Sequence, residues 1–277
     1  MLIERVSNIS CEIFVNNYLK ENKPVIVTDA MDSWSARRKW TPSYFETRFG
    51  GREVPVYGDL FDVVDVTTLE DYIANNFNRP ENVSCSRYVR WYAKFRDVDF
   101  IWADEVFGLL KDDWGMPYFL PNCGYVIPPS LNGRTVGVER SKFPYRGIFI
   151  SGRGARTRFH RDPWGTSAIL CQIYGVKAIS IGSSQRGDAY EDELVPGEMI
   201  FIPNDWLHQV TSLTDSISVT WNFIYKHFFN YFLRKIESNC GERDLDVIRF
   251  FLDDALPAGS SVTEISNYIK TIFNSVG

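Results

Sequence analysis

The chain has 277 residues, of which 44% are hydrophobic and 15% aromatic, so it can bury a large core in one α+β or β-barrel domain or in two smaller domains. Its net charge of −5 argues against a protein that binds duplex nucleic acid through overall positive charge. The five widely spaced cysteines include no CxxC pair and favour neither a zinc knuckle nor a disulfide framework. No apolar window is long enough for a membrane span, and the N-terminal residues lack the apolar region of a secretion signal, so we expect a cytosolic protein without a membrane partner.

The first third of the sequence alternates helix and strand signals. Ser10 and Thr41 stand at helix N-cap positions before apolar residues, and Pro42 follows at the first helical position. The pattern predicts helices over residues 10–23, 41–50 and 67–77, and short strands over 24–29 and 53–59.

Short β-rich runs punctuated by Gly, Pro and Asp begin near residue 145, which is typical of a small antiparallel barrel or sandwich. These runs cover residues 145–152, 156–162, 167–182, 198–203 and 216–224. The remaining C-terminal residues carry Phe and Ile at helical spacing and predict three amphipathic helices, over 226–239, 242–256 and 261–277.

Two of the three histidines lie in or beside the β-rich runs. His160 and Asp162 are two residues apart in a predicted strand, so their side chains point to the same face. His208 follows a Pro-Asn-Asp corner after the strand at 198–203. Two histidines and a carboxylate on one side of a metal ion leave three positions open, as in the facial triad of non-haem Fe(II) oxygenases. The alternative is a hydrogen-bonded His160–Asp162 pair at the rim of a barrel.

A lysine interrupts an apolar strand face. With a period of two, the run from Cys171 to Ile181 places Lys177 among apolar residues, where a buried ammonium is costly unless it is paired. Lys177 therefore either forms an ion pair with a protein carboxylate or binds an anionic ligand inside the barrel. The last strand has a polar face that lines either a wet cavity or the protein surface, formed by Ser216, Ser218, Thr220 and Asn222.

Together, the runs "TRFHRDPWGTSAILCQIYGVK" and "LVPGEMIFIPNDWLHQVTSLTDSISVTWNF" resemble the Jumonji C (JmjC) family of Fe(II)- and 2-oxoglutarate-dependent oxygenases, particularly its small cupin-like hydroxylases. Upstream, "KPVIVTDAMDSW", "WTPSYFETRFGGREVPVY" and "TTLEDYI" resemble the N-terminal half of these proteins. The resemblance implies an α+β fold with a double-stranded β-helix (jelly-roll) core.

The same resemblance implies one oxygenase domain over residues 1–225, with a helix-rich part at 1–144 and the barrel core at about 145–225. A C-terminal helical segment follows at 226–277. Several small relatives dimerise through such helices, which implies a homodimer; alternatively, these helices cover their own barrel.

Carried over residue by residue, the resemblance implies that iron is bound by His160, Asp162 and His208. It implies that Lys177 pairs with the distal carboxylate of 2-oxoglutarate. Tyr92 matches a family tyrosine that binds the same carboxylate, or it is an ordinary core aromatic.

Three further positions match residues of the family's cosubstrate pocket: Thr157, Thr220 and Asn222. Strand parity puts Thr157 on the face opposite the iron ligands unless a bulge intervenes. Leu170 departs from the family, since close relatives carry a pocket asparagine there.

Arg158 is the most suggestive difference from the family, whose members usually have Pro or Gly before the first ligand. By parity Arg158 shares the face of His160 and Asp162, where it would bind a substrate carboxylate or phosphate. The alternative is a structural salt bridge.

The resemblance implies an enzyme that uses Fe(II), 2-oxoglutarate and O₂ to hydroxylate an unactivated C–H bond, most simply of an amino-acid side chain in a protein or peptide. The alternatives are the same chemistry on a small metabolite, a free amino acid or an RNA nucleoside, and a cupin-type binding protein without turnover. We expect substrate choice to lie in the loops Pro121–Arg140 and Gly182–Glu193, and His227 to be structural.

Overall fold

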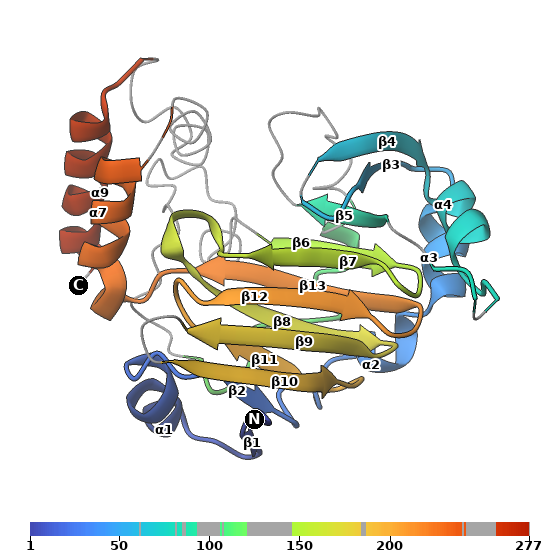
Figure 1. The fold of residues 1–277 in the computed structure, drawn as a ribbon, viewed down its shortest axis with the longest axis horizontal. Coiled ribbons are helices and arrows are strands. Elements are labelled where there is room, and N and C mark those ends of the chain that lie inside the picture. Colours follow the sequence, from blue (N-terminus) through green and yellow to red (C-terminus); the bar gives the residue numbers. More distant parts are fainter. Residues whose placement is uncertain are drawn as a thin grey trace.

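A computed structural model describes residues 1–60, 62–80, 82–84, 87–92, 106, 108–120, 146–183, 187–239, 241 and 259–276 (Figure 1). In this part of the chain the strands form two sheets. The larger sheet has nine strands, in the spatial order β1 (Arg5–Val6), β2 (Val25–Val27), β11 (Met199–Ile202), β8 (Ser167–Tyr174), β13 (Ser216–Phe223), β6 (Arg146–Ser151), β5 (Tyr88–Tyr92), β3 (Glu53–Tyr57) and β4 (Val63–Thr68). The smaller sheet has four, in the order β10 (Asp188–Leu194), β9 (Lys177–Ser183), β12 (Leu207–Ser212) and β7 (Arg156–His160).

The strands β6 to β13 divide equally between the two sheets, which lie face to face (Figure 1). This arrangement is the double-stranded β-helix that the sequence resemblance implies, and the α+β jelly-roll prediction is confirmed. The strands β1 to β5 extend the larger sheet at its two edges, so the N-terminal part of the chain is continuous with the barrel rather than a separate unit.

Apolar residues of the helices pack in the main core together with residues of the larger sheet. The helices are α1 (Cys11–Phe14), which continues as the π-helical turn η1 (Val15–Leu19), then α2 (Ala36–Lys39), α3 (Pro42–Phe49), α4 (Leu69–Asn76), the short 3₁₀ turns η2 (Pro163–Gly165) and η3 (Lys226–Phe228), α7 (Phe229–Asn239) and α9 (Val262–Val276). The predicted N-caps are confirmed: Ser10 accepts from the Ile13 amide at 3.2 Å, and Thr41 accepts from the Tyr44 amide at 3.1 Å.

The run predicted as one strand over residues 167–182 is two strands in different sheets. The chain turns at Gly175, whose φ is 76° and where a Cβ would lie 1.9 Å from a backbone carbonyl oxygen. Cys171 on β8 therefore belongs to the core behind the larger sheet, whereas Ile179 on β9 points between the sheets. Lys177 lies on the same inner face of β9 as Ile179. The single apolar face predicted to run from Cys171 to Ile181 does not exist, because the chain turns between the two strands.

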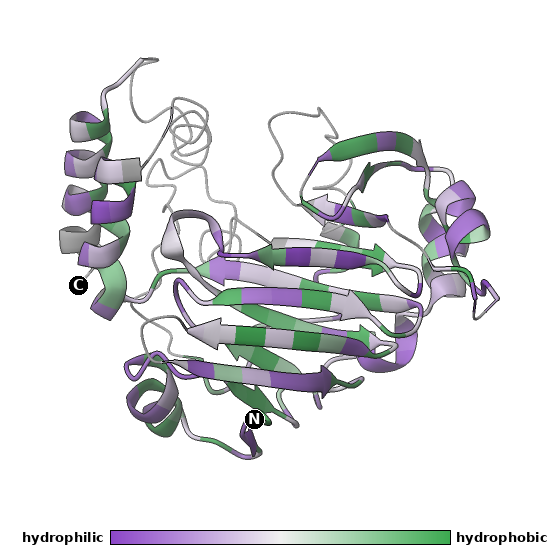
Figure 2. Cartoon of the chain, in the orientation of Figure 1, coloured by the Kyte–Doolittle hydropathy of each residue, from purple (hydrophilic) through white to green (hydrophobic). Residues whose placement is uncertain are grey.

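The sequence predicted a loop over Gly182–Glu193, and this prediction is wrong. Its ends belong to β9 and β10, and residues 184–186 lie outside the described part. β10 escaped prediction because it is an edge strand with a largely hydrophilic sequence (Figure 2). The other expected loop, Pro121–Arg140, lies outside the described residues.

The C-terminal helices α7 and α9 lie side by side at one end of the molecule (Figure 1). Their apolar residues, such as Phe232, Ile236 and Ile269, are part of the main core, so these helices cover their own barrel. The helix expected over 242–256 falls outside the described residues, and a homodimer through this segment stays a prediction.

Among the helices that the structure describes, none has the length and apolar character needed to span a membrane. Cys171 is a buried free thiol, and burial raises its pKa well above the ordinary value. Cys85, Cys123 and Cys240 lie outside the described residues.

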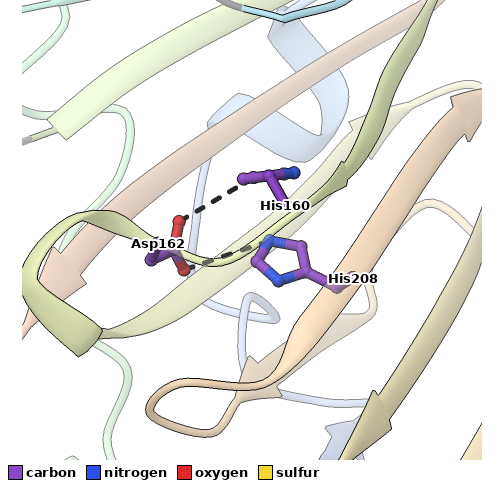
Figure 3. Close-up of side chains that lie close together, drawn as sticks. All are labelled: His160, Asp162 and His208. Carbon is purple, nitrogen blue, oxygen red and sulfur yellow. Dashed lines mark ion pairs between the residues drawn. The ribbon is translucent and has the colours of Figure 1, made fainter.

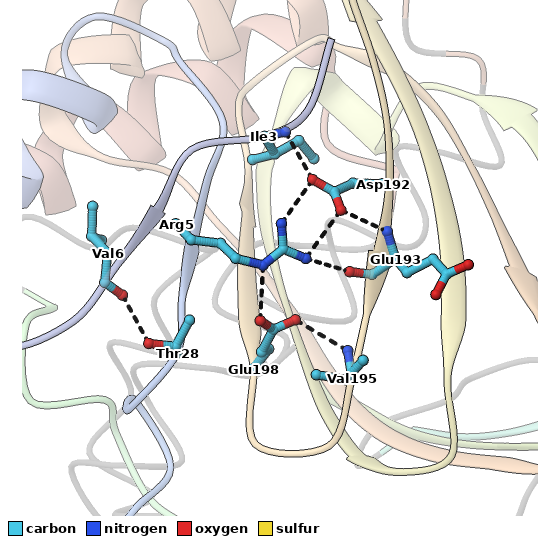
Figure 4. Close-up of polar contacts among 8 residues, drawn as sticks. All are labelled: Ile3, Arg5, Val6, Thr28, Asp192, Glu193, Val195 and Glu198. Atoms are coloured by element: carbon cyan, nitrogen blue, oxygen red, sulfur yellow. Dashed lines mark hydrogen bonds and ion pairs between the residues drawn. The ribbon is translucent and has the colours of Figure 1, made fainter.

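Arg5 connects the N-terminal strand to β10 and to the turn that follows it (Figure 4). Its guanidinium donates to Asp192 at 2.9 and 3.0 Å, to Glu198 at 3.0 Å and to the Glu193 carbonyl at 2.7 Å. Asp192 also accepts from the Ile3 amide at 2.9 Å. Burial alone would raise the pKa of Asp192, but these bonds hold the pKa below its ordinary value.

Replacing Arg5 by Met is expected to lower the free energy of unfolding by about 1–2 kcal/mol at pH 7, because charge-assisted bonds are lost at a partly exposed site. The depressed pKa of Asp192 stabilises the fold above its unfolded pKa of about 3.9, and this contribution disappears as the pH falls through the folded value. Urea unfolding should therefore show a difference between wild type and variant that shrinks below about pH 4. Lys23→Met, which removes the more exposed ion pair with Glu4, is the control; an equal loss in both variants would contradict the prediction.

Candidate metal centre

His160, Asp162 and His208 come together on the inner side of the smaller sheet (Figure 3). His160 ends β7, Asp162 follows two residues later, and His208 lies on β12 directly opposite His160. The His160 Nε2 atom is 4.0 Å from Asp162 Oδ1, and the His208 Nε2 atom is 4.0 Å from Asp162 Oδ2. These distances are too long for hydrogen bonds, so the alternative of a hydrogen-bonded His160–Asp162 pair is not what the structure has.

Backbone carbonyls orient both imidazoles. His160 Nδ1 donates to the Arg158 carbonyl at 2.8 Å, and His208 Nδ1 donates to the Trp206 carbonyl at 3.0 Å. Because a carbonyl only accepts, Nδ1 carries the proton and the Nε2 lone pair faces Asp162. Asp162 Oδ2 is buried and has no hydrogen-bond partner among the described residues. Two imidazole lone pairs and this carboxylate, with ligand atoms all within 4.8 Å of one another, fit a divalent transition-metal ion.

His160 is held in the neutral form that a ligand needs. Burial lowers its pKa to about 4, and the nearby His208 and the positive charge of Arg90 also lower it. The negative charge of Asp162 raises the pKa but does not offset these effects. At neutral pH a metal ion therefore does not have to displace a proton from this imidazole.

A β-bulge brings Thr157 to the ligand face. Val210 on β12 lies opposite Thr157, and His208 lies opposite His160, so β7 has one more residue than β12 between the two pairs. Residues directly opposite each other point to the same side of a sheet. Thr157 thus shares the inner face with His160 despite being three residues away from it.

The same bulge overturns the prediction for Arg158. In a regular strand the side chains of Arg158 and His160 would point to the same face. The extra residue in β7 changes this alternation, so that they point to opposite faces. The Arg158 side chain is 50% exposed, its Nε is 2.8 Å from Asp59 Oδ2, and its amide donates to the Asp59 carbonyl. Arg158 forms the structural salt bridge that was its alternative.

Lys177 lies deep between the sheets and is 4% exposed. Its Nζ donates to Ser218 Oγ at 2.7 Å, from the smaller sheet to the larger one. Among the described residues no carboxylate lies within ion-pair distance of Lys177, and burial lowers its pKa to about 7. Within the described part of the chain, the partner of Lys177 is thus the Ser218 hydroxyl and not a carboxylate.

The polar face of β13 points inward, since Ser216, Ser218 and Asn222 are buried. Thr220 Oγ1 donates to the Ile169 carbonyl at 2.9 Å, and Asn222 Nδ2 donates to Thr166 Oγ1 at 3.1 Å. This face is therefore buried in the protein and does not form its surface.

Three other sequence positions are placed as follows. Leu170 lies in the apolar cluster between the sheets, beside Trp206 and Ile179. Tyr92 has its backbone on β5 opposite Gly147, but its side chain lies outside the described part. His227 is exposed in η3 and is not among the residues grouped as metal ligands in the described part of the chain.

Sequence analysis missed Arg90 on β5. Its side chain is 7% exposed, and the guanidinium carbon lies 5.2 Å from the ring centroids of both Tyr57 and Phe149. The signal was present in "YVRWY", where an arginine occupies the same strand face as Tyr92.

Helix α7 contacts the turn at Asp205, which precedes the strand of His208, and the segment that follows Asp162. The Tyr231 hydroxyl donates to Asp205 Oδ2 at 2.5 Å, and Lys235 Nζ lies 3.4 Å from Asp205 Oδ1. Arg161, directly before Asp162, donates to the Asp205 carbonyl at 3.1 Å. Gly165, with φ of 66°, lies against Tyr231, and a Cβ there would be 2.7 Å from the ring. Helix α7 thus connects the turn before the strand of His208 with the segment that follows Asp162.

A jelly-roll barrel with two histidines and a carboxylate on its inner face defines the cupin class of metal-binding barrels. The family model described as "Cupin-like domain" matches residues 10–185 and 183–231, and the chain belongs to this family.

Curated relatives agree with the JmjC resemblance. The chain is 24% identical over 266 residues to "Arginine-specific demethylase JMJ20" of Arabidopsis thaliana, covering 80% of this chain and 57% of that protein. It is 23% identical over 265 residues to "2-oxoglutarate and iron-dependent oxygenase JMJD4" of Mus musculus, covering 76% and 57%. It is 26% identical over 256 residues to "JmjC domain-containing protein A" of Dictyostelium discoideum, covering 78% and 92%. The chain thus spans little more than half of the first two relatives.

Replacing His160, Asp162 or His208 by Ala is expected to weaken Mn²⁺ or Co²⁺ binding by at least about 100-fold, because each change removes one of three ligands. The far-UV circular dichroism of the metal-free protein should stay unchanged, since none of these side chains belongs to an apolar core cluster. Isothermal titration with His227→Ala as the matched control tests this. Unchanged metal affinity in the three variants would show that the metal binds elsewhere.

Proposed function

We propose that this chain is an Fe(II)- and 2-oxoglutarate-dependent oxygenase that hydroxylates an unactivated C–H bond of an amino-acid side chain in a protein or peptide. The observation that carries the proposal is the joint placement of a three-ligand metal centre and a buried lysine between the same two sheets. The names of the relatives support the cofactor pair and the class of substrate, since they specify iron, 2-oxoglutarate and arginine.

Iron held by His160, Asp162 and His208 would couple decarboxylation of 2-oxoglutarate, to succinate and CO₂, to insertion of one oxygen atom from O₂ into the substrate C–H bond. The protein's own part is positioning. Lys177, supported by Ser218, would bind the distal carboxylate of 2-oxoglutarate.

The interior also contains polar groups that would line the cosubstrate, namely Thr157, Thr220 and Asn222. The apolar cluster of Leu170, Ile179, Ile181 and Trp206 fills the adjoining part of the barrel and keeps water away from one side of the site. A bond from the Tyr92 hydroxyl to the distal carboxylate is proposed from the resemblance alone.

The same chemistry on a small metabolite, a free amino acid or an RNA nucleoside is the second candidate, and a non-catalytic cupin is the third. The complete ligand set, together with Lys177, argues against the third. A cytosolic location, a homodimer, and the absence of duplex nucleic-acid and membrane partners stay predictions.

Succinate release from 2-oxoglutarate with Fe(II) and O₂ should rise above the uncoupled background only with the right class of substrate. Panels of peptides, free amino acids and tRNA, with His208→Ala as the inactive control, identify that class. We expect a peptide to give the largest stimulation. A larger response to a free amino acid or to tRNA would favour the second candidate, and equal release by the His208→Ala variant would refute the oxygenase function.

Lys177→Ala should raise the 2-oxoglutarate concentration needed for half-maximal turnover about 10- to 100-fold, because a charge-assisted contact contributes roughly 1.5–3 kcal/mol. The pKa of about 7 in the free protein means that Lys177 loses its proton as the pH rises above 7, so cosubstrate binding should weaken there and be coupled to proton uptake. Titrations in buffers of different ionisation enthalpy measure this uptake. The variant should show none, whereas Lys39→Ala, at a surface ion pair with Asp113, should behave as wild type.

A further inference from the structure

Asp162 lies outside the strands, unlike the two histidines of the candidate metal centre. His160 and His208 are directly opposite each other on β7 and β12, so the pairing of these strands fixes their relative position. Asp162 lies two residues beyond His160, directly before the 3₁₀ turn η2, and its side chain does not cap that turn. The position of its carboxylate therefore depends on how residues 161–165 are held.

Residues 161–165 are bonded at both of their ends to the turn that precedes β12. At one end Arg161 Nε donates to the Asp205 carbonyl at 3.1 Å, and at the other Asn204 Nδ2 donates to the Gly165 carbonyl at 3.0 Å. Asn204 is 5% exposed, so the second of these bonds is shielded from water. The segment between the two bonds, which contains the carboxylate ligand, thus takes its position from this turn.

Asp205 in this turn has a left-handed backbone and a side chain bonded to helix α7. Its φ is 61°, a conformation that Asp tolerates better than most residues with a side chain. Its Oδ2 accepts from the Tyr231 hydroxyl at 2.5 Å, and its Oδ1 lies 3.4 Å from Lys235 Nζ. The Asp205 side chain is 20% exposed, so its bonds to the helix are partly protected from competing water.

Tyr231 contacts the segment of Asp162 as well as the turn. A Cβ at Gly165, where φ is 66°, would lie 2.7 Å from the Tyr231 ring, so the ring lies directly against that backbone. The hydroxyl of the same side chain is bonded to Asp205. One tyrosine of α7 therefore contacts both parts of the chain whose relative position places the carboxylate ligand.

We propose that Asp205 and Tyr231 are a pair of positioning residues for the metal centre, and that the bond between them sets where the Asp162 carboxylate lies relative to the two imidazoles. Neither side chain belongs to the ligand set; both act through the turn and through residues 161–165. This inference rests on the metal centre of the proposed function. It extends that centre to helix α7, and it concerns metal binding rather than the oxidation reaction.

Tyr231→Phe removes the hydroxyl and keeps the ring against Gly165. It should weaken Mn²⁺ binding to the full chain about 3- to 10-fold, which is less than the 10- to 100-fold typical of a direct partner of a ligand, because the pair lies one contact further away. Ni²⁺ binding should change less than about 2-fold. Carboxylates suit Mn²⁺ whereas imidazole suits Ni²⁺, so a misplaced carboxylate affects mainly Mn²⁺. Titration calorimetry measures both affinities without turnover.

Two substitutions of Asp205 separate its side chain from its backbone conformation. Asp205→Gly removes the carboxylate but adopts a φ of 61° freely, and it should lose at least as much Mn²⁺ affinity as Tyr231→Phe. Asp205→Asn keeps an oxygen that accepts from the tyrosine hydroxyl and should recover most of the affinity. Combining Tyr231→Phe with Asp205→Gly should cost no more than Asp205→Gly alone, because both changes break the same bond.

Ser238→Ala is the matched control, because it also removes one hydroxyl from α7, an exposed one that donates to the Arg234 carbonyl within the helix. It should change neither affinity. Equal weakening of Mn²⁺ and Ni²⁺ binding by Tyr231→Phe would show a general structural role and overturn the inference. Unchanged Mn²⁺ affinity would also overturn it, even if urea unfolding of the metal-free variant showed a loss of stability. If the wild-type protein binds neither metal ion, the metal centre and the proposed function themselves fail.

Discussion

β7 and β12 pair with His160 directly opposite His208, and one extra residue in β7 separates this pair from Thr157 and Val210. Opposite residues on antiparallel strands have their Cβ atoms about 4.5–5.5 Å apart, which brings the two imidazole ring centroids to 4.2 Å. A register shift of one residue would turn one imidazole to the outside of the barrel. The metal centre, the inward position of Thr157 and the outward position of Arg158 all depend on this register.

The interior between the sheets is divided into two chemically different parts. On the side of β2, β11 and β9 it is filled by Ile26, Ile200, Ile181 and Leu194. On the side of β13, β6 and β5 it contains Ser218, Asn222 and two cations, Lys177 and Arg90. Close packing in the apolar part sets the distance between the sheets. The polar part therefore does not contribute the packing that holds the sheets together, and its buried charges are tolerated.

The sequence predicted those features that depend on local spacing. Helix caps at Ser10 and Thr41 and the shared face of His160 and Asp162 needed only one segment of chain each. Some features that depend on the pairing of two strands were missed or wrong, although the partnership of His208 with His160 was predicted. The bulge that turns the Arg158 side chain outward is a property of the β7–β12 pair. The glycine at the Gly175 turn is required by the backbone carbonyl of Asp215, which lies 40 residues later in the chain. Arg90 was missed because the aromatic rings that it contacts, Tyr57 and Phe149, come from two other strands, β3 and β6.

Charge balance gives the interior a preference among ligands. Among the described residues, Asp162 is the carboxylate of the metal centre, and Lys177 is buried between the sheets. A divalent metal ion added to this set makes the site more positive, and burial strengthens the repulsion among these charges. A dianion that reaches from the metal to Lys177 relieves that repulsion at both ends, whereas a neutral or singly charged ligand leaves one end uncompensated. Under the proposed function, this balance favours 2-oxoglutarate over a keto acid that lacks the distal carboxylate.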